Sequence, residues 1–278
     1  MGSRFLPATK VVPKELFPLV DRPLIQEVVG EAVASGMSDL ILVTARGKSA
    51  IEDFFDIDPA LESFLEMKGD QGMLERVREV SRMVQVVSVR QKEPLGLGHA
   101  VLCARDIVGS EPFAVILPDD LIDAATPCLA QLLSVFARTG KSVVALQKVP
   151  DDQTHMYGII KGHETEPGVY RIESFVEKPS PGTAPSNYAV IGRYILVPGI
   201  FHLLESQDRG VGGEIQLTDA LNSLAGEDAI YGVVFEGIRH DAGDRLGLLK
   251  ANIHYALKDD DLGPRLMQFM TDKVSLKE

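Results

Sequence analysis

Apolar residues along the chain recur with two spacings, and the order of these spacings predicts an α/β fold. Short apolar runs predict strands over 39–44, 84–89, 113–120 and 142–149, and the third of these should end in a loop at its C-terminal end. Apolar residues at helical spacing predict helices over 24–33, 49–55, 98–108 and 126–139. Strands and helices that alternate in this way favour a parallel sheet with helices on both faces.

The pattern changes after Pro150 and predicts a mixed second half. A hairpin is expected over 157–179, because two apolar segments flank a polar turn at 163–168. The elements expected after it are a strand at 188–196, a helix at 213–225, a strand at 231–237 and a helix at 245–257. Residues 56–83, which are charged and amphipathic, should form a helical excursion from the sheet.

No linker rich in Gly, Ser or Pro and no repeat divides the chain. We therefore predict a single domain, 1–278. Its α/β part at 1–150 is followed by a mixed part at 151–243 and by C-terminal helices at 244–278.

The first fifteen residues, MGSRFLPATKVVPKE, are basic within an acidic protein. Arg4, Lys10 and Lys14 precede the first carboxylate, Glu15, and prolines argue against a helix or an interior strand. Such a loop suits a clamp over a polyphosphate, because a guanidinium and an ammonium can neutralise developing charge. The alternative is a frayed basic N-terminus, which composition alone favours.

The charge balance excludes some classes of partner. Lys and Arg number 28 and Asp and Glu number 40, a net charge of −12 that disfavours binding to nucleic acid or to an anionic membrane. No apolar run approaches membrane-spanning length, and the N-terminus has no signal-peptide pattern. Cys103 and Cys128 are predicted to be reduced thiols. We expect a cytoplasmic protein whose partners are neither nucleic acid nor membrane.

Carboxylates follow two of the predicted strands. Asp119 and Asp120 follow an apolar strand, where ligands bind in open α/β sheets, and Mg²⁺ prefers such hard oxygen ligands. Asp241, in the segment HDAGD, could supply a second carboxylate, while Asp244 is better explained as a helix cap. The alternative at both places is an ordinary solvated turn.

Two further segments could bind a substrate. Glu177 and Lys178 end a predicted strand, where a carboxylate could accept sugar hydroxyls and an ammonium could bind phosphate. An exposed charge pair is the alternative. The segment GLGHA at 96–100 could cradle a phosphate or could be a tight turn with close packing, and it is too short for a dinucleotide fingerprint.

Each of these signals is weak alone, but their order along the chain is specific. The segments are GSRFLPATKVVPKE, DRPLIQ, GLGHAV, LPD, FVEKP, GEIQLTDA and HDAG. In this order the chain resembles the bacterial UTP–glucose-1-phosphate uridylyltransferases, within the sugar nucleotidyltransferase family. The resemblance runs from Gly2 to about Lys250.

The resemblance implies a Rossmann-like, three-layer α/β nucleotidyltransferase fold with a mixed, mainly parallel sheet. It implies that UTP and glucose 1-phosphate are the substrates, that Mg²⁺ is the cofactor, and that pyrophosphate is released with UDP-glucose. Residues 1–150 would then bind the nucleotide and 151–243 the sugar phosphate. The family also suggests a homo-oligomer, a dimer or tetramer, in which 56–83 and the C-terminal helices could form the interface.

The resemblance also implies roles for single residues. The implied catalytic residues are Arg4 and Lys14, on the triphosphate and the leaving pyrophosphate, and Lys178. The implied nucleotide-binding residues are Gly2, Gln91, Gly96 and Asp120, with Gln91 and Gly96 reading the uracil. The implied metal ligands are Asp119 and Asp241. The implied sugar-phosphate site consists of Gly158, Glu177, Lys178 and Glu214.

The chain departs from the family at its beginning. The family motif starts with an apolar strand and an Ala-Gly-x-Gly turn, of which only MGSR is present. We therefore expect that the first family strand is missing and that the natural start lies upstream of Met1. Arg245 stands where the family usually has Lys.

Other functions remain open on the sequence alone. A related enzyme could use dTTP or another sugar 1-phosphate, and a non-catalytic regulatory paralogue could keep the fold. An oxidoreductase built on GLGHA is disfavoured, because no acidic ribose ligand follows a strand at the required distance.

Overall fold

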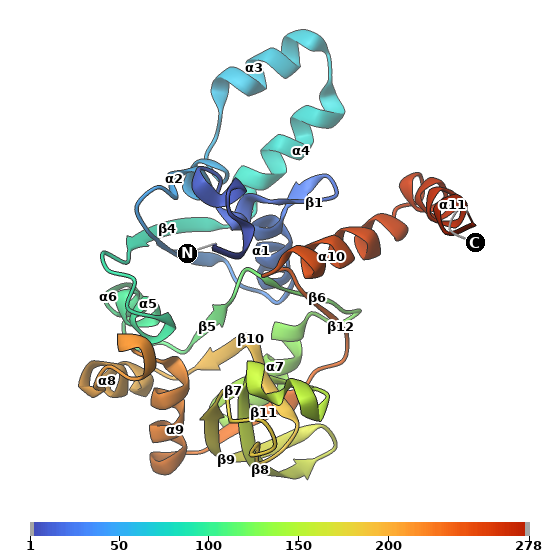
Figure 1. Ribbon diagram of the computed structural model, residues 1–278. Helices are drawn as coiled ribbons and strands as arrows, with labels where there is room; N and C mark the ends of the chain where they lie inside the picture. The colour runs from blue at the N-terminus through green and yellow to red at the C-terminus, as the bar shows by residue number, and fades with distance from the viewer. Residues whose placement is uncertain (1–2, 276–278) are drawn as a thin grey trace.

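The computed structural model describes residues 3–275, and a six-stranded mixed sheet forms its centre (Figure 1). In spatial order the strands are β5 (Phe113–Ile116), β10 (Tyr188–Leu196), β7 (Ser142–Lys148), β11 (Ile230–Val234), β9 (Val169–Glu177) and β8 (Gly158–Glu166). The predicted α/β class with a mixed sheet is confirmed.

The expectation of a mainly parallel sheet is wrong for this sheet. Only β7 and β11 run parallel, and the other neighbouring strands run antiparallel. The physical reason lies in the connections after Pro150. There β8 and β9 follow one another through a short turn without a crossover helix, and strands joined in that way must be antiparallel.

Helices cover both faces of the six-stranded sheet, as predicted. One face packs against α7 (Cys128–Thr139), and the other packs against α5 (Leu97–Cys103), α8 (Gly199–Ser206) and α9 (Leu217–Glu227). In β7, Val144 and Leu146 belong to one core cluster, and Val143 and Ala145 belong to the other. Burial on both faces explains why this strand is a continuous apolar run.

A second body is built on a separate parallel pair, β3 (Asp39–Thr44) and β4 (Gln85–Arg90), and it packs against α1 (Leu24–Ala34) and α2 (Ser49–Asp53). Between these strands, α3 (Pro59–Lys68) and α4 (Gln71–Arg82) project from the molecule, which confirms the predicted excursion (Figure 1). Among residues 3–275 no strand joins β3 to β5, and the first element described is a 3₁₀ turn at Ser3–Phe5.

Two short ladders and the C-terminal helices complete the fold. The antiparallel pair of β6 (Asp120–Asp123) and β12 (Ile238–Asp241) lies beside the main sheet, and β1 (Pro18–Leu19) pairs with β2 (Arg22–Pro23). The sequence analysis missed all four strands. The segment 113–120, predicted as a strand that ends in a loop, consists of β5 and a turn, and its last residue begins β6. The chain ends with α10 (Arg245–Leu257), which Asp244 caps as predicted, and α11 (Leu262–Ser275).

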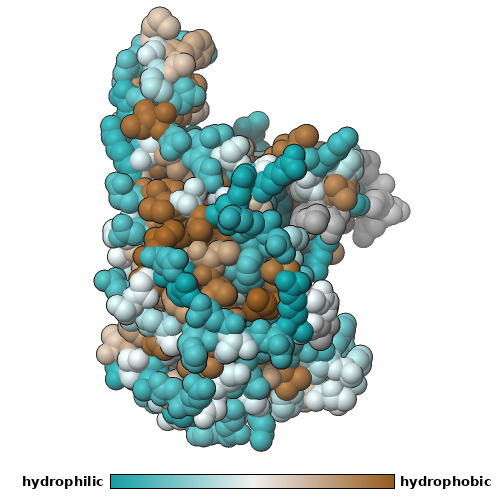
Figure 2. All heavy atoms as spheres, turned by 90° about the vertical axis from the view of Figure 1, so that its left-hand side faces the viewer, coloured by the Kyte–Doolittle hydropathy of each residue, from teal (hydrophilic) through white to brown (hydrophobic). Residues whose placement is uncertain are grey.

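The helical arm of α3 exposes apolar side chains, and one of the two cysteines is buried in the core. Leu61, Phe64 and Met67 of α3 are at least 40% exposed, and Figure 2 shows brown and tan surface on this arm. Cys128 is fully buried and unpaired, and burial raises its pKa to about 12. None of the helices in residues 3–275 is long and apolar enough to cross a membrane.

Candidate active site

Three of the predicted site residues converge beside Gly243. Asp119 lies in the turn between β5 and β6, and Asp241 is the last residue of β12. The backbone N–H of Ala242 donates to the carbonyl of Asp119 at 2.8 Å, which joins the two segments. A Cβ atom at Gly243 would lie 2.9 Å from Asp241 Oδ1, 3.0 Å from Asp119 Oδ2 and 3.7 Å from Arg4 Nη1. Two carboxylates and a guanidinium therefore surround one small space that only a glycine leaves open.

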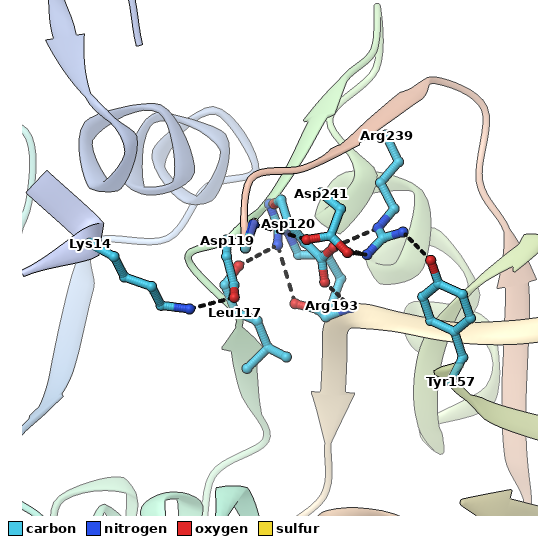
Figure 3. Close-up of polar contacts among 10 residues, drawn as sticks. Lys14, Leu117, Asp119, Asp120, Tyr157, Arg193, Arg239 and Asp241 are labelled. Atoms are coloured by element: carbon cyan, nitrogen blue, oxygen red, sulfur yellow. Dashed lines mark hydrogen bonds and ion pairs between the residues drawn. The ribbon is translucent and has the colours of Figure 1, made fainter. Parts of the chain in front are cut away.

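Lys14 joins this group through an ion pair with Asp119 (Figure 3). Its Nζ lies 2.5 Å from Asp119 Oδ2, and the side chains are 25% and 30% exposed. Burial alone would raise the pKa of the Asp119 carboxyl, but the ammonium of Lys14 outweighs burial and holds that pKa below its ordinary value. Asp119 is therefore ionised at neutral pH, as a metal ligand must be.

Asp120 points in the opposite direction, into the protein. Its Oδ2 accepts a hydrogen bond from the Gly192 N–H at 3.1 Å, and its Oδ1 lies 2.5 Å from Arg239 Nε. A Cβ atom at Gly192 would lie 2.6 Å from Asp120 Oδ2, so glycine is required there. Both oxygens have partners inside the protein and the residue is 8% exposed, so its carboxylate faces the protein interior.

Two arginines that the sequence analysis missed support these carboxylates. Arg239 of β12 contacts both Asp120 and Asp241. Arg193 of β10 is fully buried and forms an ion pair with Glu31 of α1 at 2.8 Å. It also donates to the carbonyls of Leu117, Gly192 and Asp120 at 3.1, 3.2 and 2.7 Å. A charged residue within the apolar run YAVIGRYIL was the signal that could have revealed Arg193.

Three of the four predicted sugar-phosphate residues, Gly158, Glu177 and Lys178, form a second group where β8 begins and β9 ends. Gly158 is paired with Glu177 across the ladder, and a Cβ atom at Gly158 would lie 3.2 Å from Glu177 Oε2. Lys178 Nζ lies 3.3 Å from Glu177 Oε1. The hydroxyl of Thr218, another residue that was missed, donates to Glu177 Oε2 at 2.8 Å.

The backbone of Lys178 explains how neighbouring residues reach the same side. Its φ is +43°, a left-handed conformation that is rare and strained for a residue with a side chain. Its N–H donates to the carbonyl of Tyr157 at 3.0 Å, which holds the turned conformation. Strain of this kind concentrates at functional sites, and here it brings the ammonium beside the Glu177 carboxylate.

The predicted uracil-reading residues form a third group at the end of β4. Gln91 Nε2 donates to the Gly96 carbonyl at 3.0 Å and lies 3.0 Å from His99 Nδ1. Glu214, which was predicted to line the sugar pocket, lies here, since a Cβ atom at Gly96 would be 2.8 Å from its Cβ. A cavity of 310 Å³ adjoins this group, and Arg90, Lys92 and His99 are among its lining residues.

The segment GLGHA packs closely against the segment that carries Glu214 and Ile215. The Gly98 N–H donates to the Ile215 carbonyl at 2.9 Å, and a Cβ atom at Gly98 would lie 2.7 Å from that oxygen. Of the two interpretations left open by the sequence, the structure supports close packing. Gly2, predicted to contact the nucleotide, lies outside the described residues.

The carboxylates fit a metal ion that is shared with a phosphorylated ligand. Among residues 3–275 no group of three or more His, Cys, Asp or Glu side chains is arranged to hold a metal ion by itself. Mg²⁺, however, commonly takes one or two protein carboxylates and completes its shell with phosphate oxygens and water. The space between Asp119 Oδ2 and Asp241 Oδ1 suits this mode of binding.

The chain is similar to known proteins along its whole length. Residues 1–257 match the family model described as nucleotidyl transferase. The UTP–glucose-1-phosphate uridylyltransferase of Bacillus subtilis (strain 168) is 48% identical over 278 residues, 100% of this chain and 95% of the relative. A crystal structure of UDP-glucose pyrophosphorylase with UDP-glucose has a TM-score of 0.86 and 41% identity, covering 93% of this chain and 96% of the other. A UTP-bound UGPase from Acinetobacter baumannii has a TM-score of 0.87 and 40% identity, covering 97% and 95%.

Proposed function

Because the chain belongs to the nucleotidyl transferase family and, within it, to the UTP–glucose-1-phosphate uridylyltransferases, we propose that it transfers a uridylyl group from UTP to α-D-glucose 1-phosphate. The products are UDP-glucose and pyrophosphate. The observation that carries this proposal is the convergence of Arg4, Asp119 and Asp241 on the space beside Gly243, with Lys14 next to it.

The reaction joins two anions, so charge neutralisation and positioning are its main requirements. The phosphate of glucose 1-phosphate attacks the α-phosphorus of UTP in line, and the attacking oxygen is already ionised. No protein nucleophile or general base is needed. Arg4 and Lys14 supply positive charge for the triphosphate and for the leaving pyrophosphate.

We propose that the divalent cation of this reaction is Mg²⁺, held by Asp119 and Asp241 together with phosphate oxygens. When bound, the ion neutralises charge on the phosphates and orients them. For its triphosphate role, Lys14 Nζ must leave Asp119 Oδ2 and move to a phosphate. Until then the ion pair with Lys14 neutralises the partly exposed carboxylate of Asp119.

We assign the sugar phosphate to the edge of β8 and β9. Lys178 would bind the phosphate, and Glu177 would accept hydroxyl groups of the glucose. Gly158 allows a sugar ring to approach Glu177, because any side chain there would meet its carboxylate. The uracil is assigned to Gln91 and Gly96, at the end of β4.

The assignment of Lys178 gives a direct test. We expect Lys178→Ala to raise the KM for glucose 1-phosphate by about 10- to 100-fold, the loss of one charge-assisted hydrogen bond, and to change the KM for UTP much less. Lys161→Ala is the matched control, because Lys161 is 63% exposed and pairs with Glu173, as Lys178 is 64% exposed and pairs with Glu177. An equal rise in both KM values for Lys178→Ala would remove its assigned role.

The nucleotide is tested separately by measuring pyrophosphate release from UTP, dTTP, ATP, CTP and GTP with glucose 1-phosphate. We expect UTP to react fastest, and faster turnover of dTTP would refute the substrate assignment. The cytoplasmic location and the homo-oligomeric state, dimer or tetramer, remain predictions. Sedimentation of the purified protein, with Phe64→Glu on the exposed face of α3 as the comparison, tests the oligomeric state.

A further inference from the structure

Three carboxylates meet where β6 and β12 pair, although the proposed reaction uses only two of them. Asp120 lies directly opposite Asp241 in the antiparallel ladder, and Asp119 immediately precedes Asp120. Like charges directly opposite each other destabilise a ladder. The side chains differ in exposure: Asp119 is 30%, Asp241 35% and Asp120 11% exposed. Two carboxylates therefore open to solvent and the third is enclosed.

Arg239 lies between the enclosed carboxylate and one of the open ones (Figure 3). Its Nη2 lies 2.5 Å from Asp120 Oδ1 and 3.2 Å from Asp241 Oδ2. Its side chain is 9% exposed, and Tyr157 holds it from the other side, with the hydroxyl 3.4 Å from Nη1. A guanidinium can make these contacts at once because its donors form a fixed fork, which an ammonium lacks.

The contacts of Arg239 leave one orientation for Asp241. Its Oδ2 is held by Arg239, and its Oδ1 accepts the Gly243 N–H at 2.9 Å and faces the space that it shares with Asp119 Oδ2. Oδ2 of Asp120, the oxygen that does not contact Arg239, accepts a hydrogen bond from the Gly192 N–H.

We propose that Arg239 is a positioning residue for uridylyl transfer. Through its contacts, Asp119 and Asp241 face the metal–nucleotide complex and Asp120 does not. The inference rests on the proposed function. It replaces the predicted contact of Asp120 with the nucleotide by an indirect role: Asp120 balances the charge of Arg239, so that Arg239 orients Asp241 without neutralising it. Asp241 then keeps its negative charge for a divalent cation beside Asp119, whose own partner in this structure is Lys14.

Removal of the Asp120 charge tests this balance. In Asp120→Asn, Arg239 has Asp241 as its only remaining carboxylate, and we expect it to compete with a divalent ion there. Mn²⁺, the probe, is titrated into the full-length protein without nucleotide or sugar, and free Mn²⁺ is followed by electron paramagnetic resonance. The expected result is a dissociation constant raised about tenfold, the effect of one uncompensated charge a few ångströms from the ion. Asp228→Asn, which breaks the ion pair of Asp228 with Lys141 at 2.8 Å, is the matched control and should leave Mn²⁺ binding unchanged.

The double variant Asp120→Asn, Arg239→Met separates a balancing role from direct ligation. If Asp120 acts through Arg239, removing the arginine as well restores Mn²⁺ affinity to within about threefold of the wild type, because the charge of the site is again balanced. The rate of UDP-glucose formation should stay at least tenfold low, because Asp241 has lost the donor on its Oδ2. Arg239→Lys keeps the positive charge but lacks the planar set of donors. Its rate of UDP-glucose formation should lie between the rates of the wild type and the double variant.

Two outcomes overturn the proposal. If Asp120→Asn weakens Mn²⁺ binding and the double variant does not recover it, Asp120 is itself a metal ligand. If Asp120→Asn lowers Tm and leaves Mn²⁺ affinity unchanged, the Arg239–Asp120 pair is only structural. Because Mn²⁺ binding is measured without substrates, these results are independent of the substrate panel. A wild-type protein that makes no UDP-glucose refutes the proposed function and leaves the metal titration interpretable.

Discussion

The buried ion pair of Arg193 and Glu31 gives a prediction whose size follows from the structure. Arg193 is 0% exposed and the Glu31 side chain is 9% exposed. Nε and Nη2 donate to the Glu31 carboxylate at 2.8 to 3.2 Å. In Arg193→Met the carboxylate keeps the Leu129 N–H, at 3.1 Å, and three backbone carbonyls each lose the hydrogen bond from Arg193.

The expected loss of stability is large. Breaking a buried ion pair by removing one partner costs about 3–5 kcal/mol, because an uncompensated charge remains inside the protein. For a chain of this size the change lowers Tm by roughly 8 °C, at about 2 °C per kcal/mol. Replacing both partners, in Arg193→Met with Glu31→Leu, should recover most of this loss, since no unpaired charge is then buried.

The free energy of unfolding is measured by urea titration with circular dichroism, and UDP-glucose formation is measured well below Tm. Activity should fall by at least about tenfold, because Arg193 holds the carbonyls of Leu117 and Asp120 on both sides of the turn that carries Asp119. Arg138→Met is the control, since Arg138 is 52% exposed and its pair with Glu166 should contribute less than about 1 kcal/mol. A loss in Arg193→Met no greater than in this control would refute the reasoning.

Two further predictions concern the same site. In Gly247→Ala the new Cβ would lie 1.7 Å from the carbonyl oxygen of Asp241. We therefore expect the free energy of unfolding in urea to fall by about 1–3 kcal/mol and the rate of UDP-glucose formation to fall about 100-fold. Gly226→Ala on α9 is the control, because open space surrounds Gly226, and it should change neither quantity. Burial raises the pKa of the Asp119 carboxyl, but Lys14 outweighs burial and holds that pKa below the ordinary 3.8. The ionised carboxylate therefore stabilises the fold above pH 3.8, and this stabilisation is lost as the pH falls through the lower pKa of the folded state. The Tm difference between wild type and Asp119→Asn should therefore persist down to about pH 4 and close below it, and a difference that closes near pH 6 would contradict this assignment.

Elements with a strong local pattern could be predicted from the sequence. The strand at 39–44 and the helix at 245–257 have the predicted bounds, because apolar spacing and the Asp244 cap lie within the segments themselves. The excursion at 56–83 was predicted for the same reason, and Asp58 and Asp70 cap its two helices.

Elements that depend on a distant partner could not be predicted. The strands DLID and IRHD of β6 and β12 are four residues long and carry charges, so neither has a recognisable pattern without the other. Arg239 likewise looks like an ordinary surface residue in sequence, and its role depends on Asp120, 119 residues away. The pairing of Asp119 with Asp241 could be suggested from the strand ends, but their convergence with Arg4 and Lys14 on one site was expected through the resemblance to a family, which contributes the tertiary information that spacing lacks.

The distance along the chain between Glu31 and Arg193 also affects how the protein is made. The two residues are separated by 162 positions, so at about 5–20 residues per second the ribosome needs roughly 10 to 30 s to deliver the arginine after the glutamate. During that interval the carboxylate of Glu31 on α1 lacks the arginine that pairs with it in the folded protein. We therefore expect nascent chains that stop before Arg193 to be more open to proteases than chains that extend past β10.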